Sequence, residues 1–367
     1  MAPEVEVQLI AVIVAAACAL PGVFLVLRRM AMLSDAISHT VLLGIVLGYL
    51  LTRDLGSPLL FVGAVAMGVV TVALVELVTG TGLIREDAAI GLVFPVLFSI
   101  AVILISRFTG NVHLDVDSVL LGELVFAPFD RVSLLGLDLP RALLVGLVTL
   151  LANLLLIGLF YKELKLATFD AGLAAALGFA PALVHYGLMT MVSVTAVGAF
   201  DAVGSILVIA LMVAPPAAAY LLTDRLSRML LLSVLIGAAS AIAGYWLAYW
   251  LDVSVAGAMA TLSGVAFGLC YLFAPGRGLV AGAARRARQR WEFAQQMLAL
   301  HLLNHEGTAE ASEECSPSRL SAHLRWPPAF AAEVVRRAEQ GGLVRRRGEL
   351  LTLTERGRNL AQEASLR

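Results

Sequence analysis

The sequence predicts an all-α polytopic membrane bundle of about nine transmembrane helices, followed by a small α+β domain on the cytoplasmic side. The first observation is composition: of 367 residues, 60% are hydrophobic and 14% charged, and the mean hydropathy is +0.89. A soluble domain carries about 25% charged residues, which excludes an ordinary soluble enzyme. The second is a change in charge density near residue 277, because the last 90 residues hold 24 of the 53 charged side chains. Such a break indicates a domain boundary.

Nine stretches are long and apolar enough to cross a membrane, which takes about 20 residues. They are residues 7–27, 31–51, 58–79, 88–106, 139–161, 182–199, 202–222, 229–251 and 255–274. Only Phe200 and Asp201 separate the sixth stretch from the seventh. One of these two stretches is therefore either a full span or a re-entrant half-helix. The segment 110–128 is too short and too charged to span.

Basic residues predict the orientation of the bundle, since cytoplasmic loops are enriched in Lys and Arg. Most of them follow the odd-numbered spans, at Arg28, Arg29, Arg85, Lys162, Lys165, Arg225, Arg228 and Arg277. We therefore expect a multi-pass protein of the inner or plasma membrane, with its N-terminus outside and its basic C-terminal domain in the cytoplasm.

Ionisable groups inside spans are costly and usually face a cavity or a partner. The clearest are Asp35 and His39, four residues apart and therefore on one helix face, with Ser34 and Ser38 nearby. An imidazole beside a carboxylate suits a borderline divalent cation, and two ligands suit a site that a moving ion must leave. The alternative is an Asp–His hydrogen bond that only locks helix packing.

Other polar groups at membrane depth are weaker candidates. We expect Glu76 to be interfacial, Asp201 either to cap a helix or to line a pathway, and His185 to anchor the interface beside Tyr186. An external cluster either attracts cations or is an ordinary solvated loop, and it contains His113, Asp115, Asp117 and Glu123.

The loop from Lys162 to Pro181 predicts a short apolar helix on the cytoplasmic face. Thr168 or Asp170 is suited to cap its start and Gly178 to end it. Such a helix is either a docking element for a soluble partner or an amphipathic helix that lies on membrane lipid.

Four ordered runs together resemble one known family, the zinc and manganese branch of the metal-uptake ABC transporter permeases. They are LRRMAMLSDAISHTVLLGI (27–45), EDAAIGLVF (86–94), FYKELKLATFD (160–170) and LMVAPPAAAYLLTDR (211–225). The resemblance covers nearly all of residues 7–277 and implies a bundle like that of type II ABC importers. It implies a permease subunit that moves Mn²⁺, Zn²⁺ or Fe²⁺ and holds no permanently bound cofactor.

The resemblance also implies partners and site residues. The partners are a cytoplasmic ATPase subunit, a second permease subunit (the same or a different chain) and an extracytoplasmic metal-binding protein. Asp35 and His39 match the positions of the pathway cation site. The loop at 162–180 matches the helix that couples to the ATPase, through Thr168, Phe169, Asp170, Leu173, Leu177 and Gly178. The sequence has no GxxxxGK[ST] phosphate-binding loop, so we expect no enzymatic activity of its own.

The tail departs from the common pattern of that family. We divide the chain into a permease domain (1–277), a basic linker (278–288) and a cytoplasmic domain (289–367). The last has helix-like segments at 289–305, 318–324, 327–340 and 354–366, and a hairpin pattern at 343–346 and 349–353. This order resembles a winged helix, similar to the DNA-binding domain of metal-dependent repressors.

The role of this tail stays open between three interpretations. Arg336 and Arg337 would lie on the recognition helix and Arg345–Arg347 on the wing, which suits DNA. Membrane anchoring limits access to a genomic site, which favours a protein-binding or regulatory module over a nucleic acid partner. A metal-sensing role would use His301, His305 or His323.

Two other functional classes remain as alternatives to the permease. A secondary metal transporter would need acidic coupling residues at the membrane midplane and an inverted repeat, and no convincing repeat is visible. A membrane-tethered metal-responsive regulator would use the spans only as an anchor, for which nine spans and an intramembrane Asp–His pair are excessive.

Overall fold

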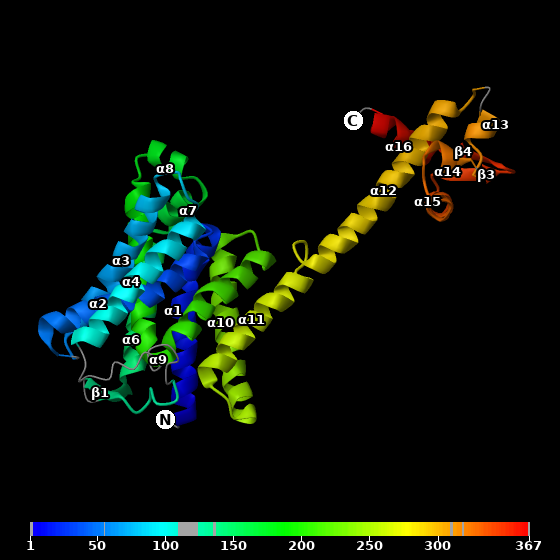
Figure 1. Cartoon of the computed structure of the whole chain (residues 1–367). Helices are drawn as coiled ribbons and strands as arrows, with labels where there is room; N and C mark the ends of the chain where they lie inside the picture. Colours follow the sequence, from blue (N-terminus) through cyan, green and yellow to red (C-terminus); the bar gives the residue numbers. More distant parts are fainter. Residues whose placement is uncertain are drawn as a thin grey trace. The chain divides into compact units, whose positions relative to one another are not determined.

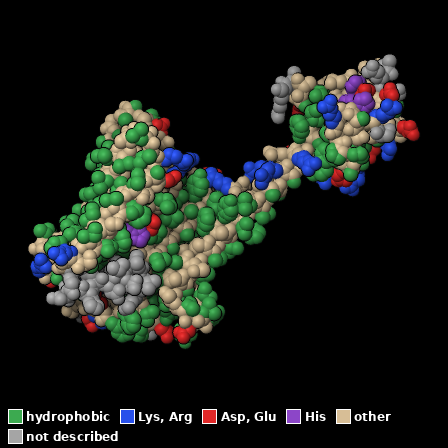
Figure 2. Space-filling view, in the orientation of Figure 1, with side chains coloured by type: hydrophobic (Ala, Val, Ile, Leu, Met, Phe, Trp, Pro, Cys, Tyr) green, Lys and Arg blue, Asp and Glu red, His purple; other side chains and the backbone are tan. Residues whose placement is uncertain are grey.

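The computed structural model describes residues 3–54, 56–108, 124–134, 137–308, 311–317 and 319–365. It divides into two compact units, Met1–Gly278 and Leu279–Arg367, which we call the membrane unit and the C-terminal unit. Hydrophobic side chains cover much of the visible surface of the membrane unit, whereas charged side chains are frequent on the C-terminal unit (Figure 2). The predicted external cluster at 113–123 and the side chain of Asp201 lie outside the described residues.

The membrane unit is a bundle of long apolar helices (Figure 1). They are α1 (Pro3–Leu27), α2 (Ala31–Thr52), α3 (Pro58–Thr79), α4 (Glu86–Phe108), α6 (Arg141–Leu159), α9 (Pro181–Leu222), α10 (Leu226–Leu251) and α11 (Val255–Phe273). Within the described residues these contain nine stretches long and apolar enough to span, because α9 contributes two. The predicted helical membrane bundle is therefore confirmed.

The two halves of α9 meet at Gly204, whose φ of 76° and ψ of 163° are not helical. Near its start, His185 lies 3.1 Å from Arg28 at the C-terminal end of α1. In its second half the backbone of Met212 lies against Gly22, near the same end of α1. A straight helix would put roughly 40 Å between His185 and Met212. The chain therefore bends sharply back, at Gly204 rather than at the predicted Phe200–Asp201 break.

Glycines allow the closest helix contacts in the bundle. A Cβ on Gly44 of α2 would lie 2.2 Å from the carbonyl oxygen of Gly63 on α3, and one on Gly22 would lie 2.0 Å from that of Met212. Small residues at such points let helix backbones approach closely in lipid. By contrast, a Cβ on Gly264 or Gly268 of α11 would meet no atom within 4 Å.

Different short elements lie at the two ends of the membrane unit (Figure 1). The hairpin of β1 (Arg131–Leu134) and β2 (Leu137–Pro140), which the sequence did not predict, lies at the end that holds the N-terminus. Its Arg131 forms an ion pair with the buried Glu6 of α1 at 3.3 Å. The helices α7 (Tyr161–Phe169) and α8 (Ala171–Ala176) lie at the opposite end.

The C-terminal unit has its own hydrophobic core, built around Leu298, Leu320, Val334 and Leu351. Its elements are α12 (Leu279–His305), α13 (Ala311–Glu314), α14 (Leu320–His323), α15 (Pro328–Gln340), β3 (Val344–Arg347), β4 (Leu350–Leu353) and α16 (Glu355–Ser365). Two boundaries differ from the prediction. The expected basic linker is the first part of the continuous helix α12, and the hairpin turn lies at Gly348–Glu349 instead of Arg347–Gly348.

Candidate metal site

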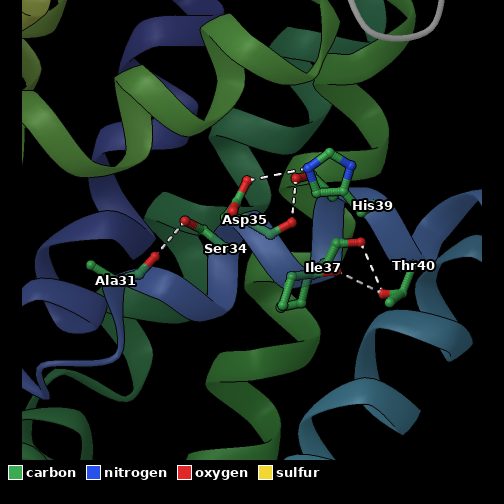
Figure 3. A network of polar contacts seen from close by, with 8 residues as sticks. Ala31, Ser34, Asp35, Ile37, His39 and Thr40 are labelled. Atoms are coloured by element: carbon green, nitrogen blue, oxygen red, sulfur yellow. Dashed lines mark hydrogen bonds and ion pairs between the residues drawn. The ribbon is translucent and has the colours of Figure 1, made fainter. Parts of the chain in front are cut away.

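The candidate metal ligands Asp35 and His39 lie in the first half of α2 (Figure 3). Their four-residue spacing brings His39 Nε2 to 3.4 Å from Asp35 Oδ1. His39 is the ninth helical residue, roughly 12 Å along the axis from the start of α2. The side chain of His39 is 27% exposed and that of Asp35 is 39% exposed in the single chain, so both remain accessible to an ion. The structure thus brings the two predicted ligands together on one helix face.

The ring of His39 is positioned by two aromatic side chains of α4. It stacks on Phe94 with ring centroids 5.5 Å apart and meets the edge of Phe98 at 5.8 Å. These contacts restrict rotation of the imidazole, which keeps its Nε2 directed toward Asp35. Placing ligands in this way on a rigid helix favours a defined site.

The neighbouring serines bond to the backbone of their own helix. Ser34 donates its hydroxyl hydrogen to the carbonyl of Ala31, and Ser38 donates to the carbonyl of Asp35, both at 2.7 Å. Figure 3 shows the Ser34 hydroxyl directed at the backbone of its own helix. The pair therefore offers one carboxylate and one imidazole as ligand groups.

A cavity of about 530 Å³ lies beside the part of α2 that follows His39. Val41 and Ile45 of α2, Ala64 of α3 and Val197 of α9 contribute to its apolar wall. Asp130 and Arg141 lie at the same cavity and form an ion pair at 3.8 Å. This space lies between helices that contribute to the core, toward the β1–β2 end of the membrane unit.

A polar network joins four segments at the α7–α8 end of the bundle. Arg28 donates through Nε to the hydroxyl of Thr168 at 3.2 Å and through Nη1 to His185 Nδ1 at 3.1 Å. The other ring nitrogen of His185 lies 2.7 Å from Glu76 Oε1, and the Tyr186 hydroxyl donates to Glu76 Oε2 at 2.5 Å. We call these five residues the Arg28 network. Burial lowers the pKa of the Arg28 guanidinium from its ordinary value.

Sequence reasoning missed the Arg28 network. It assigned Glu76 and His185 separately to the membrane interface. It used Arg28 only as one of the basic residues that predict the orientation of the bundle. One signal was present, because an ionisable residue inside a span is a functional candidate by default, with a partner to be found. The contacting partners lie more than 100 positions apart in the chain, so no sequence spacing relates them.

The predicted coupling segment forms two short helices instead of one. Asp170 separates α7 from α8 and caps α8 by accepting from the backbone N–H of Leu173 at 2.8 Å, whereas Thr168 lies within α7. Gly178, with a φ of 87°, follows α8. Phe169, Leu173 and Leu177 are 61%, 47% and 61% exposed. This end of the membrane unit therefore presents a large apolar surface on two short helices.

Residues 5–274 match the sequence profile of the ABC 3 transport family. Over 357 residues the chain is 53% identical to the zinc transport system membrane protein TroD of Treponema pallidum, covering 97% of each chain. Over 282 residues it is 49% identical to the manganese transport system membrane protein MntD of Bacillus subtilis, covering 77% of this chain and 95% of that one.

A solved structure of PsaBC from Streptococcus pneumoniae, in complex with a Fab, contains a similar chain. It is 27% identical, has a TM-score of 0.63, and the similarity covers 76% of this chain and 94% of that chain. The similarity to the family profile, to curated relatives and to a solved fold thus extends over the membrane unit. The 97% coverage by TroD also includes the C-terminal unit.

Proposed function

This chain belongs to the ABC 3 transport family, and from that premise we propose that it is the permease subunit of an importer for a divalent transition-metal ion. An ABC permease of this kind works with an ATPase and a substrate-binding protein. Relatives named for zinc and for manganese transport support the substrate class. Carboxylate and imidazole together accept Mn²⁺, Zn²⁺ and Fe²⁺, so the donor set agrees with each of these ions.

The observation that carries the proposal is the Asp35–His39 pair. The two side chains lie 3.4 Å apart on a helix that is otherwise strongly apolar, and they stay partly exposed. A carboxylate at membrane depth is costly unless it serves a cation or a partner. With two ligands from the described residues, an ion would be held loosely enough to leave, as conduction requires.

The α7–α8 segment supports docking of the ATPase subunit. Phe169, Leu173 and Leu177 form an exposed apolar surface at the end opposite the N-terminus. Thr168, one residue before Phe169, accepts a hydrogen bond from Arg28 and thereby connects this segment to the Arg28 network. Movement of the docked helices would pass through that network to α1, α3 and α9. The membrane helices would then alternate between outward and inward access.

A second permease subunit, the same or a different chain, completes the pathway in this proposal. The partial exposure of Asp35 and His39 leaves room for ligands from outside this chain. The N-terminus and the β1–β2 hairpin would face the extracytoplasmic metal-binding protein. The C-terminal unit would then lie in the cytoplasm, in agreement with the basic residues that follow the odd-numbered spans.

For the C-terminal unit we propose a winged helix that acts as a regulatory or protein-binding module. Arg336 and Arg337, the recognition-helix arginines, both hydrogen-bond to Glu333 of their own helix, at 2.7 and 2.6 Å. These bonds lower the pKa of the Glu333 carboxyl to about 2. Arg337 also lies over the ring of Trp291, 4.1 Å from its centroid. Arginines held by intramolecular partners are less available to DNA phosphates.

Uptake of ⁵⁴Mn²⁺ and ⁶⁵Zn²⁺ tests the permease proposal in cells that express the complete transporter. We expect Asp35→Asn and His39→Gln each to reduce uptake of the transported metal by about tenfold or more, because each removes one ligand. Glu292→Gln is the matched control, since Glu292 belongs to an i,i+4 pair with Arg288 that lies on α12, outside the membrane unit.

Two results of the uptake experiment would contradict the proposal. Unchanged uptake by both variants, at normal amounts in the membrane, would show that Asp35 and His39 form only a structural pair. Uptake that persists when the ATPase subunit is absent would contradict the ABC importer and favour a secondary transporter.

A further inference from the structure

The C-terminal unit contains a group of metal-ligating side chains far in sequence from the Asp35–His39 pair. His301 and His305 lie one turn apart at the C-terminal end of α12, and Glu314 ends α13. One ligand atom from each of these three residues lies within 4.8 Å of the others. Figure 2 shows several histidines beside acidic side chains on this unit.

His323 of α14 is the fourth member of the group. Its Nδ1 lies 3.0 Å from Glu314 Oε2, and its ring stacks on His301 with centroids 6.2 Å apart. The rings of His301 and His305 lie 4.8 Å apart. Three imidazoles from two helices thus surround the single carboxylate of Glu314.

The pairing of Glu314 differs from that of nearby carboxylates in the same unit. Glu306 pairs with Arg358 at 2.7 Å, Glu313 with Arg319 at 3.1 Å, and Glu333 with two arginines. Glu314 faces His301 and His323 instead, at 3.7 and 3.0 Å. A carboxylate that only needs a counter-charge is served better by an arginine, which is always charged.

A backbone carbonyl also orients one of the proposed metal ligands. His301 Nε2 lies 3.0 Å from the backbone carbonyl oxygen of Glu314. A metal-ligating histidine commonly donates its second ring nitrogen to a carbonyl, which orients the ring. The side chains of His301 and Glu314 are only 11% and 18% exposed, so water competes weakly for them. Cys315 is directed into the core and is not assigned as a ligand.

We propose that His301, His305, Glu314 and His323 bind a divalent transition-metal ion of the Zn²⁺ class, at a site separate from Asp35 and His39. Three imidazoles and one carboxylate are ligands typical of a tetrahedral Zn²⁺ site, with metal–ligand distances near ~2.0–2.2 Å. Ligand atoms of His301, His305 and Glu314 already lie within 4.8 Å of one another, and His323 Nδ1 lies 3.0 Å from Glu314 Oε2. Occupancy would tie the end of α12 to α13 and α14 and so stabilise this part of the unit.

Zinc binding by the purified full-length chain tests this site without any measurement of transport, so failure of the permease proposal would not affect it. The chain with both Asp35→Asn and His39→Gln serves as the background, because it lacks the other candidate site. We expect equilibrium dialysis with Zn²⁺ to find one bound ion per chain in this background.

Adding His305→Asn and Glu314→Gln to the background should remove that ion or weaken its binding by about 100-fold or more. Glu313→Gln is the matched control, since it changes the adjacent carboxylate and should keep the ion. Absence of a bound ion in the background, or full retention by the His305→Asn, Glu314→Gln chain, would overturn the proposal.

Amide hydrogen exchange separates a lost ligand from a lost fold. In the background chain, Zn²⁺ should slow exchange of peptides that cover His301–His305 and Leu320–His323. The variants should keep the exchange rates of β3 and β4. If Glu314→Gln unfolds the unit, the His323→Asn chain tests the site instead, because the side chain of His323 is more exposed than that of Glu314. Its Zn²⁺ binding should weaken about tenfold. Unchanged binding by a folded His323→Asn chain would remove His323 from the site.

Discussion

At the scale of single residues, Glu76 holds the Arg28 network together. Its two carboxylate oxygens bind His185 and Tyr186 on α9, and His185 in turn accepts from Arg28. Nδ1 of His185 accepts from Arg28, and its Nε2 lies 2.7 Å from Glu76 Oε1 as an ion pair. A single carboxylate thus links α3 and α9 to the segment that carries Thr168.

Replacing this carboxylate should uncouple ATP hydrolysis from transport. Hydrogen bonds to charged groups contribute about 1.5–3 kcal/mol, so we expect Glu76→Gln to lower metal uptake by roughly an order of magnitude. Binding of the ATPase subunit should stay normal, since the exposed surface of α7 and α8 is unchanged.

Transport is measured as metal uptake, and binding of the ATPase subunit is measured by its copurification with the permease. Glu163→Gln, on α7 but outside the network, serves as the control. Wild-type uptake by Glu76→Gln would mean that the network is not part of the transport cycle.

At the scale of elements, α7 and α8 present the exposed apolar side chains that we propose dock the ATPase subunit. We expect Phe169→Asp to prevent stable association of the ATPase subunit, because a charge in an apolar interface must be desolvated without a partner. The bundle should fold normally, since Phe169 is 61% exposed.

Copurification of the two subunits measures this effect. Val253→Asp is the matched control, an equally drastic change at a 52% exposed apolar residue in the turn between α10 and α11. Association that survives Phe169→Asp would place the ATPase contact elsewhere.

The bend in α9 is a second element-scale feature and depends on Gly204. A φ of 76° with a ψ of 163° belongs to a region that glycine alone enters readily. We therefore expect Gly204→Ala to destabilise the membrane unit by about 1–3 kcal/mol.

Thermal unfolding of the purified permease reports this change. Gly91→Ala in α4 is the control, because its added Cβ would meet no atom within 4 Å and alanine favours the helix. Equal melting temperatures for Gly204→Ala and wild type would show that the bend tolerates a side chain.

At the scale of the whole molecule, the chain contains two cores that do not depend on each other. One is formed by helices of the membrane unit and the other by elements from α12 to α16. Arg277, just before the boundary, donates to the carbonyl of Tyr220 at 2.8 Å and pairs with Asp224. These contacts fasten the end of the membrane unit just before Leu279.

A chain that ends at Gly278 should accordingly reach the membrane and keep its uptake activity. A chain that ends at Pro275 lacks Arg277 and should be less stable. Membrane amounts and metal uptake of the two truncated chains, compared with the full chain, check both statements. Failure of the longer chain to accumulate would mean that the C-terminal unit is required for folding.

The sequence by itself determined the membrane bundle, the positions of the spans and the pairing of Asp35 with His39. Hydrophobic length is a property of each segment alone, and an i,i+4 pair is created by local helix geometry. In the C-terminal unit, local patterns also predicted four helices and a hairpin, but not α13, the helical start of α12 or the position of the turn.

Only the tertiary structure decided which distant groups meet. It joined Arg28 to Thr168, His185 and Glu76, placed the bend of α9 at Gly204, and brought Glu314 between His301 and His323. Glu314 was not a sequence candidate, because nothing in its neighbours distinguishes it from Glu313. The physical reason is that such contacts arise from packing between helices, which no local periodicity encodes.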